Sequence, residues 1–215
     1  RVELGLGTGW YEPEHQAYGI PFPPPAERFA RLTEQLEVIT GLWGTPPGGT
    51  FDYQGRYYQL RNSPALPKPV QSPAPPLIIG GKGLRRTPML AARFADEFNV
   101  PFEPAESVAR SYAAVARASE QVGRAASGRR PLVLSAALTV VCGRSDAEVR
   151  RRAEAIGRDP DELRAGPGVA GTPEEVVEQI REYAKHGAER IFLQVLDLTD
   201  LDHLDLIASE VAPRL

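Results

Sequence analysis

The sequence alternates short apolar segments with segments of helical periodicity, and this alternation limits the possible folds more than any other feature. The apolar segments predict five strands, at about residues 2–7, 77–81, 97–100, 132–142 and 191–196. Helices between successive strands predict right-handed crossovers, and therefore a parallel sheet of the α/β class. Two architectures fit this order: an open doubly wound sheet, or part of a (β/α)8 barrel.

Helix signals fill the stretches between these strands. Apolar residues spaced by three and four predict helices at about residues 26–43, 87–94, 103–122, 145–156, 172–186 and 201–211. Thr87 and Pro88 are typical of an N-cap and a first helical residue. Ser145 and Thr172 are each followed three residues later by glutamate, which predicts two capping boxes.

The first expected strand starts at the second residue of the 215-residue chain. An eight-stranded barrel typically needs about 250 residues, and three further strand–helix units before Arg1 would supply about that length. We therefore expect residues 1–215 to be one domain, the C-terminal part of a larger barrel. A Pro-rich insertion is expected at about residues 44–76, with a small hairpin at 51–60.

Composition excludes several classes of partner. The formal net charge is −3, which argues against a nucleic-acid-binding surface. No apolar run in the sequence approaches the roughly 20 residues of a membrane-spanning helix. The single cysteine, Cys142, rules out an internal disulfide and is typical of a reducing compartment, so we expect a cytoplasmic protein.

Three strand ends carry candidate binding residues, since ligands bind at the carboxyl ends of parallel strands. The first is Gly7-Thr8-Gly9-Trp10. Glycine leaves the backbone bare, so a flat ring could lie against Gly7 and Gly9, with the Thr8 hydroxyl as an anchor and Trp10 as a wall. The alternative is a tight turn that needs glycine only for its conformation.

The second end, residues 80–88, combines Gly80, Gly81 and Gly83 with basic residues before a helix. Backbone N–H groups, the helix amino end and Lys82 could together bind a phosphate. The alternative is a set of solvated basic residues. The third end carries Asn99, which either helps to bind the same phosphate or caps the next helix.

Other polar residues carry weaker signals. Glu12, Glu14 and His15 follow the first strand and either line the pocket or lie on the surface. The helical pattern places His203 on an exposed side, and it assigns Arg150–Arg152 to a solvated face. The sequence contains no cluster with metal-ligand spacing and no nucleophile elbow, so we expect no metal.

Five motifs follow one another along the chain: Gly7–Trp10, Ile39–Trp43, Pro67–Gln71, Leu77–Gly81 and Ala95–Asn99. In this order they resemble the bacterial luciferase-like superfamily, and within it the actinobacterial oxidoreductases that use the deazaflavin coenzyme F420. The resemblance covers essentially the whole chain. It implies a (β/α)8 TIM barrel in which residues 2–7 are the fourth strand and residues 191–196 the eighth. The Pro-rich insertion, with Tyr53, Tyr57 and Tyr58, would cover the mouth of the active site.

The resemblance also implies the roles of the strand ends. Gly7, Thr8, Gly9 and Trp10 would flank the cofactor ring, while Gly80, Gly81, Lys82 and Asn99 would hold its phosphate side. Residues near the reactive ring carbon come from the first three strands in this family, so no catalytic residue is assigned here. Some deazaflavin dehydrogenases carry glutamate where this chain has Trp10.

The expected activity is hydride transfer between F420 and an organic small molecule, and relatives that dimerise make a homodimer an expectation. One alternative is an FMN-dependent monooxygenase of the same superfamily. The other is a non-catalytic member or fragment that binds no cofactor.

Overall fold

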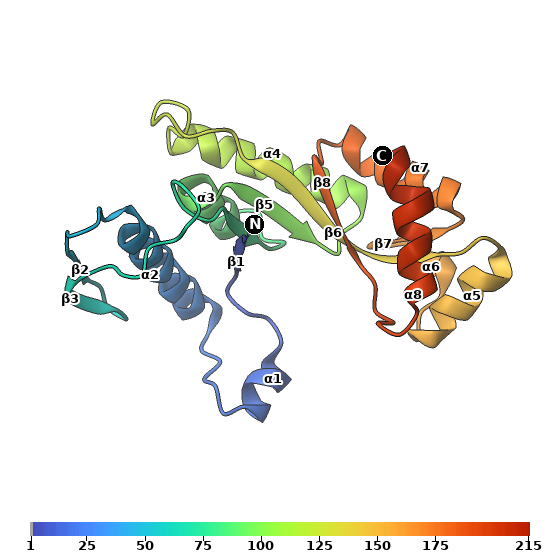
Figure 1. Cartoon of the computed structure of the whole chain (residues 1–215), viewed down its shortest axis with the longest axis horizontal. Helices are drawn as coiled ribbons and strands as arrows, with labels where there is room; N and C mark the ends of the chain where they lie inside the picture. Colours follow the sequence, from blue (N-terminus) through green and yellow to red (C-terminus); the bar gives the residue numbers. More distant parts are fainter. Residues whose placement is uncertain (1) are drawn as a thin grey trace.

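The computed structural model describes residues 2–215. Within them, six strands form one parallel sheet, which runs β1–β4–β5–β6 and continues from β6 to both β7 and β8 (Figure 1). The strands are β1 (Leu4–Leu6), β4 (Leu77–Gly80), β5 (Glu97–Pro101), β6 (Val133–Cys142), β7 (Gly168–Gly171) and β8 (Arg190–Gln194). The α/β class and the five expected strands are confirmed. Over the described residues the sheet is open, because β1 pairs only with β4 and β8 only with β6.

The strand β6 is long enough to pair with two strands in succession. Its residues 135–139 pair with β8, and its residues 139–142 pair with β7. The sequence prediction missed β7, because its four residues include two glycines and only one β-branched side chain.

Helices cover one face of the sheet and bury a continuous apolar core. This core contains Ile79, Phe98, Val100 and Leu138, packed under α3 (Arg86–Phe94), α4 (Ala105–Gln121) and α7 (Pro173–Lys185). Because side chains alternate across a strand, the residues between these core positions lie on the opposite face. That opposite face carries the polar and glycine residues considered below.

The remaining elements lie at the two ends of the sheet (Figure 1). At one end are α1 (Glu12–Ala17), α2 (Pro25–Gly44) and the hairpin of β2 (Phe51–Gln54) and β3 (Gln59–Ser63). At the other end are α5 (Asp146–Ala155), α6 (Pro160–Ala165) and α8 (Leu201–Leu206), which continues as a π turn over Ile207–Val211. The hairpin is confirmed, whereas α1 was not predicted.

Several helix starts differ in detail from the prediction. The helix α3 begins at Arg86 after an N-cap at Arg85 that makes no side-chain capping bond, so Thr87 lies inside the first turn and is buried. The Thr172 capping box is complete. Ser145 accepts from the Glu148 N–H, but the Glu148 carboxylate accepts from the Arg144 N–H, one residue earlier than in a capping box.

A single carboxylate holds the tip of the hairpin on α2. Glu34 accepts hydrogen bonds from the backbone N–H groups of Arg56, Tyr57 and Tyr58, at 2.9, 2.8 and 3.1 Å. One turn further along α2, Glu37 accepts from the Tyr53 hydroxyl at 2.6 Å. The hairpin is therefore fixed to α2 by charge-assisted hydrogen bonds.

At Gly41, the Phe51 ring of the hairpin packs directly against the backbone of α2. A Cβ at Gly41 would overlap the Phe51 ring, whereas a Cβ at Gly44 would meet nothing within 4 Å. We expect Gly41→Ala to lower the free energy of unfolding by about 1–3 kcal/mol through overpacking. Gly44→Ala, the matched control, should be neutral or slightly stabilising. Urea unfolding and proteolysis of the hairpin would check this, and equal stabilities for the two variants would contradict it.

Candidate functional site

Bare backbone lies at the carboxyl ends of β1 and β4. Leu6 pairs with Ile79, so Gly7 lies beside Gly80, and a Cβ on Gly7 would be 3.7 Å from the Gly80 carbonyl oxygen. Neither glycine has a positive φ, and a Cβ at either would make only ordinary van der Waals contacts. Glycine is thus demanded here neither by the backbone conformation nor by crowding, which is typical of a place where a ligand approaches a strand.

The turn after β1 is held by a guanidinium from α2. Arg28 donates from Nη1 to the carbonyl oxygens of Gly9, at 2.5 Å, and Thr8, at 3.4 Å. Gly9 has φ +75°, so this turn does need glycine. The Trp10 side chain is 84% exposed and contacts the Tyr11 ring at a centroid distance of 5.2 Å.

The loop after β4 runs closely past α3. Gly81 has φ +151°, and a Cβ on Gly81 or Gly83 would come within 3.3 Å of Thr87. The Lys82 ammonium does not point to an open anion site: it donates to the Phe102 carbonyl oxygen and pairs with Glu103, both at 3.0 Å. Phe102 directly follows β5 and is a non-glycine residue with φ +51°, so Lys82 stabilises an unusual backbone conformation at the neighbouring strand end.

A polar network crosses the face of the sheet opposite the helices, and sequence reasoning missed it. Arg190 donates to Glu3 at 2.9 Å and to Glu97 at 3.0 Å. The Ser135 hydroxyl donates to Glu97 at 2.6 Å, and the Asn99 amide donates to Ser135 at 2.9 Å. The hydrogen bond from Arg190 lowers the pKa of Glu3. The available signals were charged residues at the start of two apolar strands.

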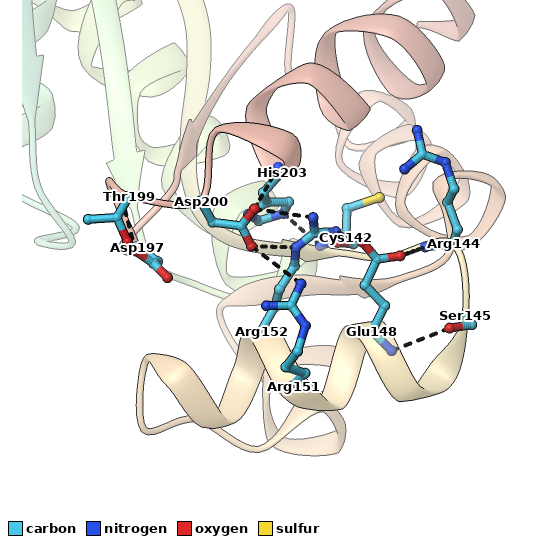
Figure 2. A network of polar contacts seen from close by, with 10 residues as sticks. All are labelled: Cys142, Arg144, Ser145, Glu148, Arg151, Arg152, Asp197, Thr199, Asp200 and His203. Atoms are coloured by element: carbon cyan, nitrogen blue, oxygen red, sulfur yellow. Dashed lines mark hydrogen bonds and ion pairs between the residues drawn. The ribbon is translucent and has the colours of Figure 1, made fainter.

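A second network surrounds Arg152 at the carboxyl end of β6 (Figure 2). The Arg152 guanidinium donates to both Asp200 oxygens, at 2.8 and 3.3 Å, and to the Cys142 carbonyl oxygen at 2.7 Å. It also pairs with Glu148 at 2.7 Å. This hydrogen bonding lowers the pKa of Asp200, and burial raises the pKa of the Cys142 thiol to about 11.

Two expectations about this region were wrong. Arg152 is 3% exposed and does not lie on a solvated face, although Arg150 and Arg151 are exposed. His203 is buried, and its Nε2 accepts a hydrogen bond from the Cys142 N–H at 2.9 Å. Arg152 from α5 and His203 from α8 both bond to Cys142 of β6. Since Arg152 also bonds to Asp200, the two side chains fix the segment between the end of β8 and the start of α8.

Some of the candidate residues lie together at the carboxyl edge of the sheet, whereas His15 makes its contacts elsewhere. Gly7, Gly80 and Asn99 lie on adjacent positions of three strands, with Asn99 in register with Gly80. In α1, His15 instead contacts the Tyr11 carbonyl oxygen at 3.0 Å and the Phe22 ring. A cavity of about 730 Å³ lies at the opposite, amino edge of the sheet, where Glu3, Glu97 and Arg190 line it.

Two further findings concern residues 2–215 as a whole. They contain no group of three or more His, Cys, Asp or Glu side chains arranged to hold a metal ion. None of their helices combines the length and the apolar character that crossing a lipid bilayer requires.

A comparison with protein families matches most of the chain to a known family. The model described as luciferase-like monooxygenase matches residues 1–158. This segment contains all of the strand ends considered as candidates.

Curated relatives include enzymes that use different cofactors. An F420-dependent glucose-6-phosphate dehydrogenase of Microbacterium testaceum is 36% identical over 98 residues, which are 46% of this chain and 27% of the relative. An FMNH(2)-dependent dimethylsulfone monooxygenase of Pseudomonas putida is 29% identical over 96 residues, 45% of this chain and 25% of the relative. These matches therefore span about a quarter of each relative.

A longer match is found with the F420-dependent glucose-6-phosphate dehydrogenase of Segniliparus rotundus. It is 29% identical over 239 residues, which cover 100% of this chain and 69% of the relative.

Solved structures share the fold at low identity. An F420-dependent secondary alcohol dehydrogenase in complex with an F420-acetone adduct matches with a TM-score of 0.77 and 17% identity, over 100% of this chain and 69% of the other. The monooxygenase RslO1 from Streptomyces bottropensis matches with a TM-score of 0.76 and 21% identity, over 99% of this chain and 68% of the other.

Proposed function

Because the chain belongs to the luciferase-like monooxygenase family, we propose that it is an oxidoreductase that uses F420 to move a hydride to or from a small organic substrate. The observation that carries the proposal is the pair of neighbouring glycines, Gly7 and Gly80, at the carboxyl ends of β1 and β4. F420-dependent relatives support the choice of cofactor.

The residues at this edge fit a flat, phosphate-bearing molecule. Gly7 and Gly80 leave a patch of backbone without side chains, against which a planar ring can lie. The amino end of α3 begins three residues after Gly83, and no side chain caps it, so its N–H groups can donate to an anion. The donor set is therefore bare backbone beside an uncapped helix end.

Each predicted residue then takes a definite place around the cofactor. Gly7, Thr8, Gly9 and Trp10 would lie beside the ring together with Gly80, which the sequence had indicated for the phosphate side. Gly81 and the first turn of α3 would hold the phosphate side. Lys82 would act indirectly, because its ammonium is bound to Phe102 and Glu103. When bound, the deazaflavin supplies the hydride chemistry, and the protein supplies position and electrostatics.

The same proposal gives the sheet a place in a larger fold. Strands β1, β4, β5, β6 and β8 pair in chain order, as strands four to eight of a (β/α)8 barrel would. The strand β7 would be an addition beyond that barrel, at the extended end of β6. The insertion over residues 44–76 and the homodimer both stay predictions.

Titration with cofactor tests the proposal directly. We expect the protein to bind F420 at micromolar concentration, detected by the change in deazaflavin fluorescence. Gly80→Val should weaken binding at least about tenfold, because its methyl groups occupy the bare patch, an effect equivalent to about 1.4 kcal/mol. Gly5→Val is the matched control: Gly5 is in the neighbouring strand β1, on the same face of the sheet but nearer the amino edge, and a Cβ there meets nothing within 4 Å.

Thermal unfolding of the variants separates lost binding from lost folding. Absence of binding of both F420 and FMN to the wild-type protein would overturn the proposal. Equal weakening by Gly80→Val and Gly5→Val would overturn the assignment of the site to the carboxyl edge.

The alternative candidate is an FMN-dependent monooxygenase, and the Pseudomonas putida relative favours it. Reduced flavin reacts with oxygen, whereas reduced deazaflavin reacts poorly. Substrate-dependent oxygen consumption with reduced FMN, together with tighter binding of FMN than of F420, would support this alternative over the F420 enzyme.

A further inference from the structure

We propose that Glu97 and Ser135 orient the Asn99 carboxamide so that its oxygen faces the bare patch beside Gly80, and that this oxygen selects a ligand group that donates a hydrogen bond. The inference rests on the proposed function, because it assigns a role inside the same cofactor site. It makes Glu97 and Ser135 positioning residues and Asn99 a specificity residue.

Glu97 is a buried carboxylate at the start of β5. Glu97 is 4% exposed, and Arg190 donates to its Oε2 at 3.0 Å. A carboxylate accepts hydrogen bonds at both of its oxygens and donates none. Glu97 Oε1 lies 2.6 Å from the hydroxyl oxygen of the fully buried Ser135. The Ser135 hydroxyl therefore donates its one proton to the hydrogen bond with Glu97.

This direction fixes the next bond along the network. With its proton donated to Glu97, the Ser135 oxygen can act only as an acceptor toward Asn99, at 2.9 Å. The amide nitrogen of Asn99 must then face Ser135, since the reverse orientation would place two acceptors against each other. The polarity of the network, not only the recorded position of the amide atoms, determines the orientation of Asn99.

The other end of the same amide points to the candidate site. Asn99 pairs with Gly80 in the sheet, and its Oδ1 lies 3.8 Å from where a Cβ on Gly80 would be. Since no group within residues 2–215 donates to Oδ1, this oxygen is available to a ligand over Gly80.

The ligand chemistry follows from the exposed acceptor. A phosphate at neutral pH carries little or no donor hydrogen, so it would place negative oxygens against Oδ1. The pyrimidinedione edge of a deazaflavin or flavin instead presents an N–H group between two carbonyls. We therefore assign Asn99 to that ring edge and not to the phosphate side that the sequence had indicated.

The experiment compares F420 and FMN, each beside its N3-methyl derivative, in which the donor hydrogen is replaced. Wild-type protein should bind the methylated form at least about tenfold more weakly than the parent. Ser135→Ala and Glu97→Gln should both reduce this discrimination ratio toward one. Ser135→Thr, which keeps the hydroxyl, should keep the wild-type discrimination ratio.

Glu97→Gln is the sharpest variant because it changes polarity with almost no change in shape. A glutamine amide can donate to Ser135, which frees the serine proton to donate to Asn99 and allows the amide to turn. A merely structural role would change the affinity for both members of each pair equally. A ratio that stays at its wild-type value in Glu97→Gln and Ser135→Ala would overturn the inference while leaving the proposed function standing.

A second measurement does not depend on any cofactor. Nuclear magnetic resonance of the Asn99 side-chain NH₂ group, assigned by its loss in Asn99→Asp, should show slow hydrogen exchange in wild-type protein and faster exchange in Ser135→Ala. Fast exchange in wild-type protein would overturn the orientation itself. Failure of both cofactors to bind would overturn the proposed function and the ligand assignment together.

Discussion

Replacing Arg152 with methionine is expected to lower the free energy of unfolding by about 3–5 kcal/mol, because it leaves buried charge without its partner. The guanidinium is 3% exposed and joins Asp200, Glu148 and the Cys142 carbonyl oxygen. Methionine keeps much of the apolar length but donates no hydrogen bond. Asp200, which is 11% exposed, and the buried Cys142 carbonyl oxygen would lose their hydrogen bonds from Arg152, whereas the partly exposed Glu148 keeps its bond from the Arg144 N–H.

Arg151→Met is the matched control for this prediction. Arg151 is the preceding residue, and its side chain is 62% exposed and reaches Asp200 only at 3.7 Å. Exposed ion pairs contribute little, so the control should cost no more than about 1 kcal/mol. Urea unfolding of the three proteins measures both values. Similar midpoints for Arg152→Met and Arg151→Met would mean that the network in Figure 2 does not stabilise the fold.

The substitution should also affect the proposed site through the chain that follows β8. Arg152 and His203 fix Asp200 against β6, so the segment from Val195 to Thr199 is held between β8 and an anchored residue. With Arg152 removed, this segment loses an anchor at the carboxyl edge of the sheet. Weaker binding of cofactor by Arg152→Met than by Arg151→Met, at a temperature where both are folded, is the expected accompanying result.

The sheet and most helices were predictable because they depend on local apolar spacing. The run Leu77–Ile79 and the stripe of α2 each signal their element without knowledge of a partner. The strand β7 was not predictable in this way. Residues 168–171 form a strand because β6 extends past the end of β5, which pairs only with its residues 133–137, and so offers unpaired backbone, a fact about tertiary structure.

The glycines of the candidate site were visible in the sequence, but the polar side chains around them were not. Arg152 lies in a run of three arginines, and only its partner Asp200, 48 residues later, distinguishes it from its neighbours. Similarly, Glu97 and Arg190 are 93 residues apart and meet because β5 and β8 both pair with β6. Spacing along one element cannot identify contacts that the sheet register creates.

Acid is expected to destabilise the protein through His203, in a pH range where the carboxylates remain ionised. His203 is buried and accepts the Cys142 N–H at Nε2, which requires an unprotonated nitrogen. Burial, and then the nearby Arg152 charge, lower the pKa of His203 below 6.5, against the smaller opposing effects of Asp200 and Glu148. Protonation would break the hydrogen bond to β6 and place a second cation beside Arg152.

The direction in which stability changes with pH follows from the number of protons bound in the folded and unfolded states. Below about pH 6.5 the histidine of the unfolded state binds a proton, whereas His203 in the folded state, with its lower pKa, does not. The unfolded state is therefore stabilised relative to the folded state as the pH falls. Stability should therefore be fully present above pH 6.5 and decrease below it, by up to about 1.4 kcal/mol per pH unit, until the pH reaches the folded pKa. Asp200, whose pKa is lowered, contributes stability that is lost only in a lower window, below about 3.8.

Urea midpoints between about pH 5 and pH 8 test this dependence. His203→Gln keeps a neutral acceptor for the Cys142 N–H but cannot be protonated in this range, so its stability should change less with pH than that of wild-type protein. His186→Gln removes a partly exposed histidine at the end of α7 and should keep the wild-type slope. If His203→Gln loses stability with acid as steeply as wild-type protein does, the buried histidine is not the group that responds.

The lost hydrogen bond joins β6 to α8, so the acid transition should begin at that junction. Faster amide exchange at Cys142 than at Val100 near pH 5 would be its first sign.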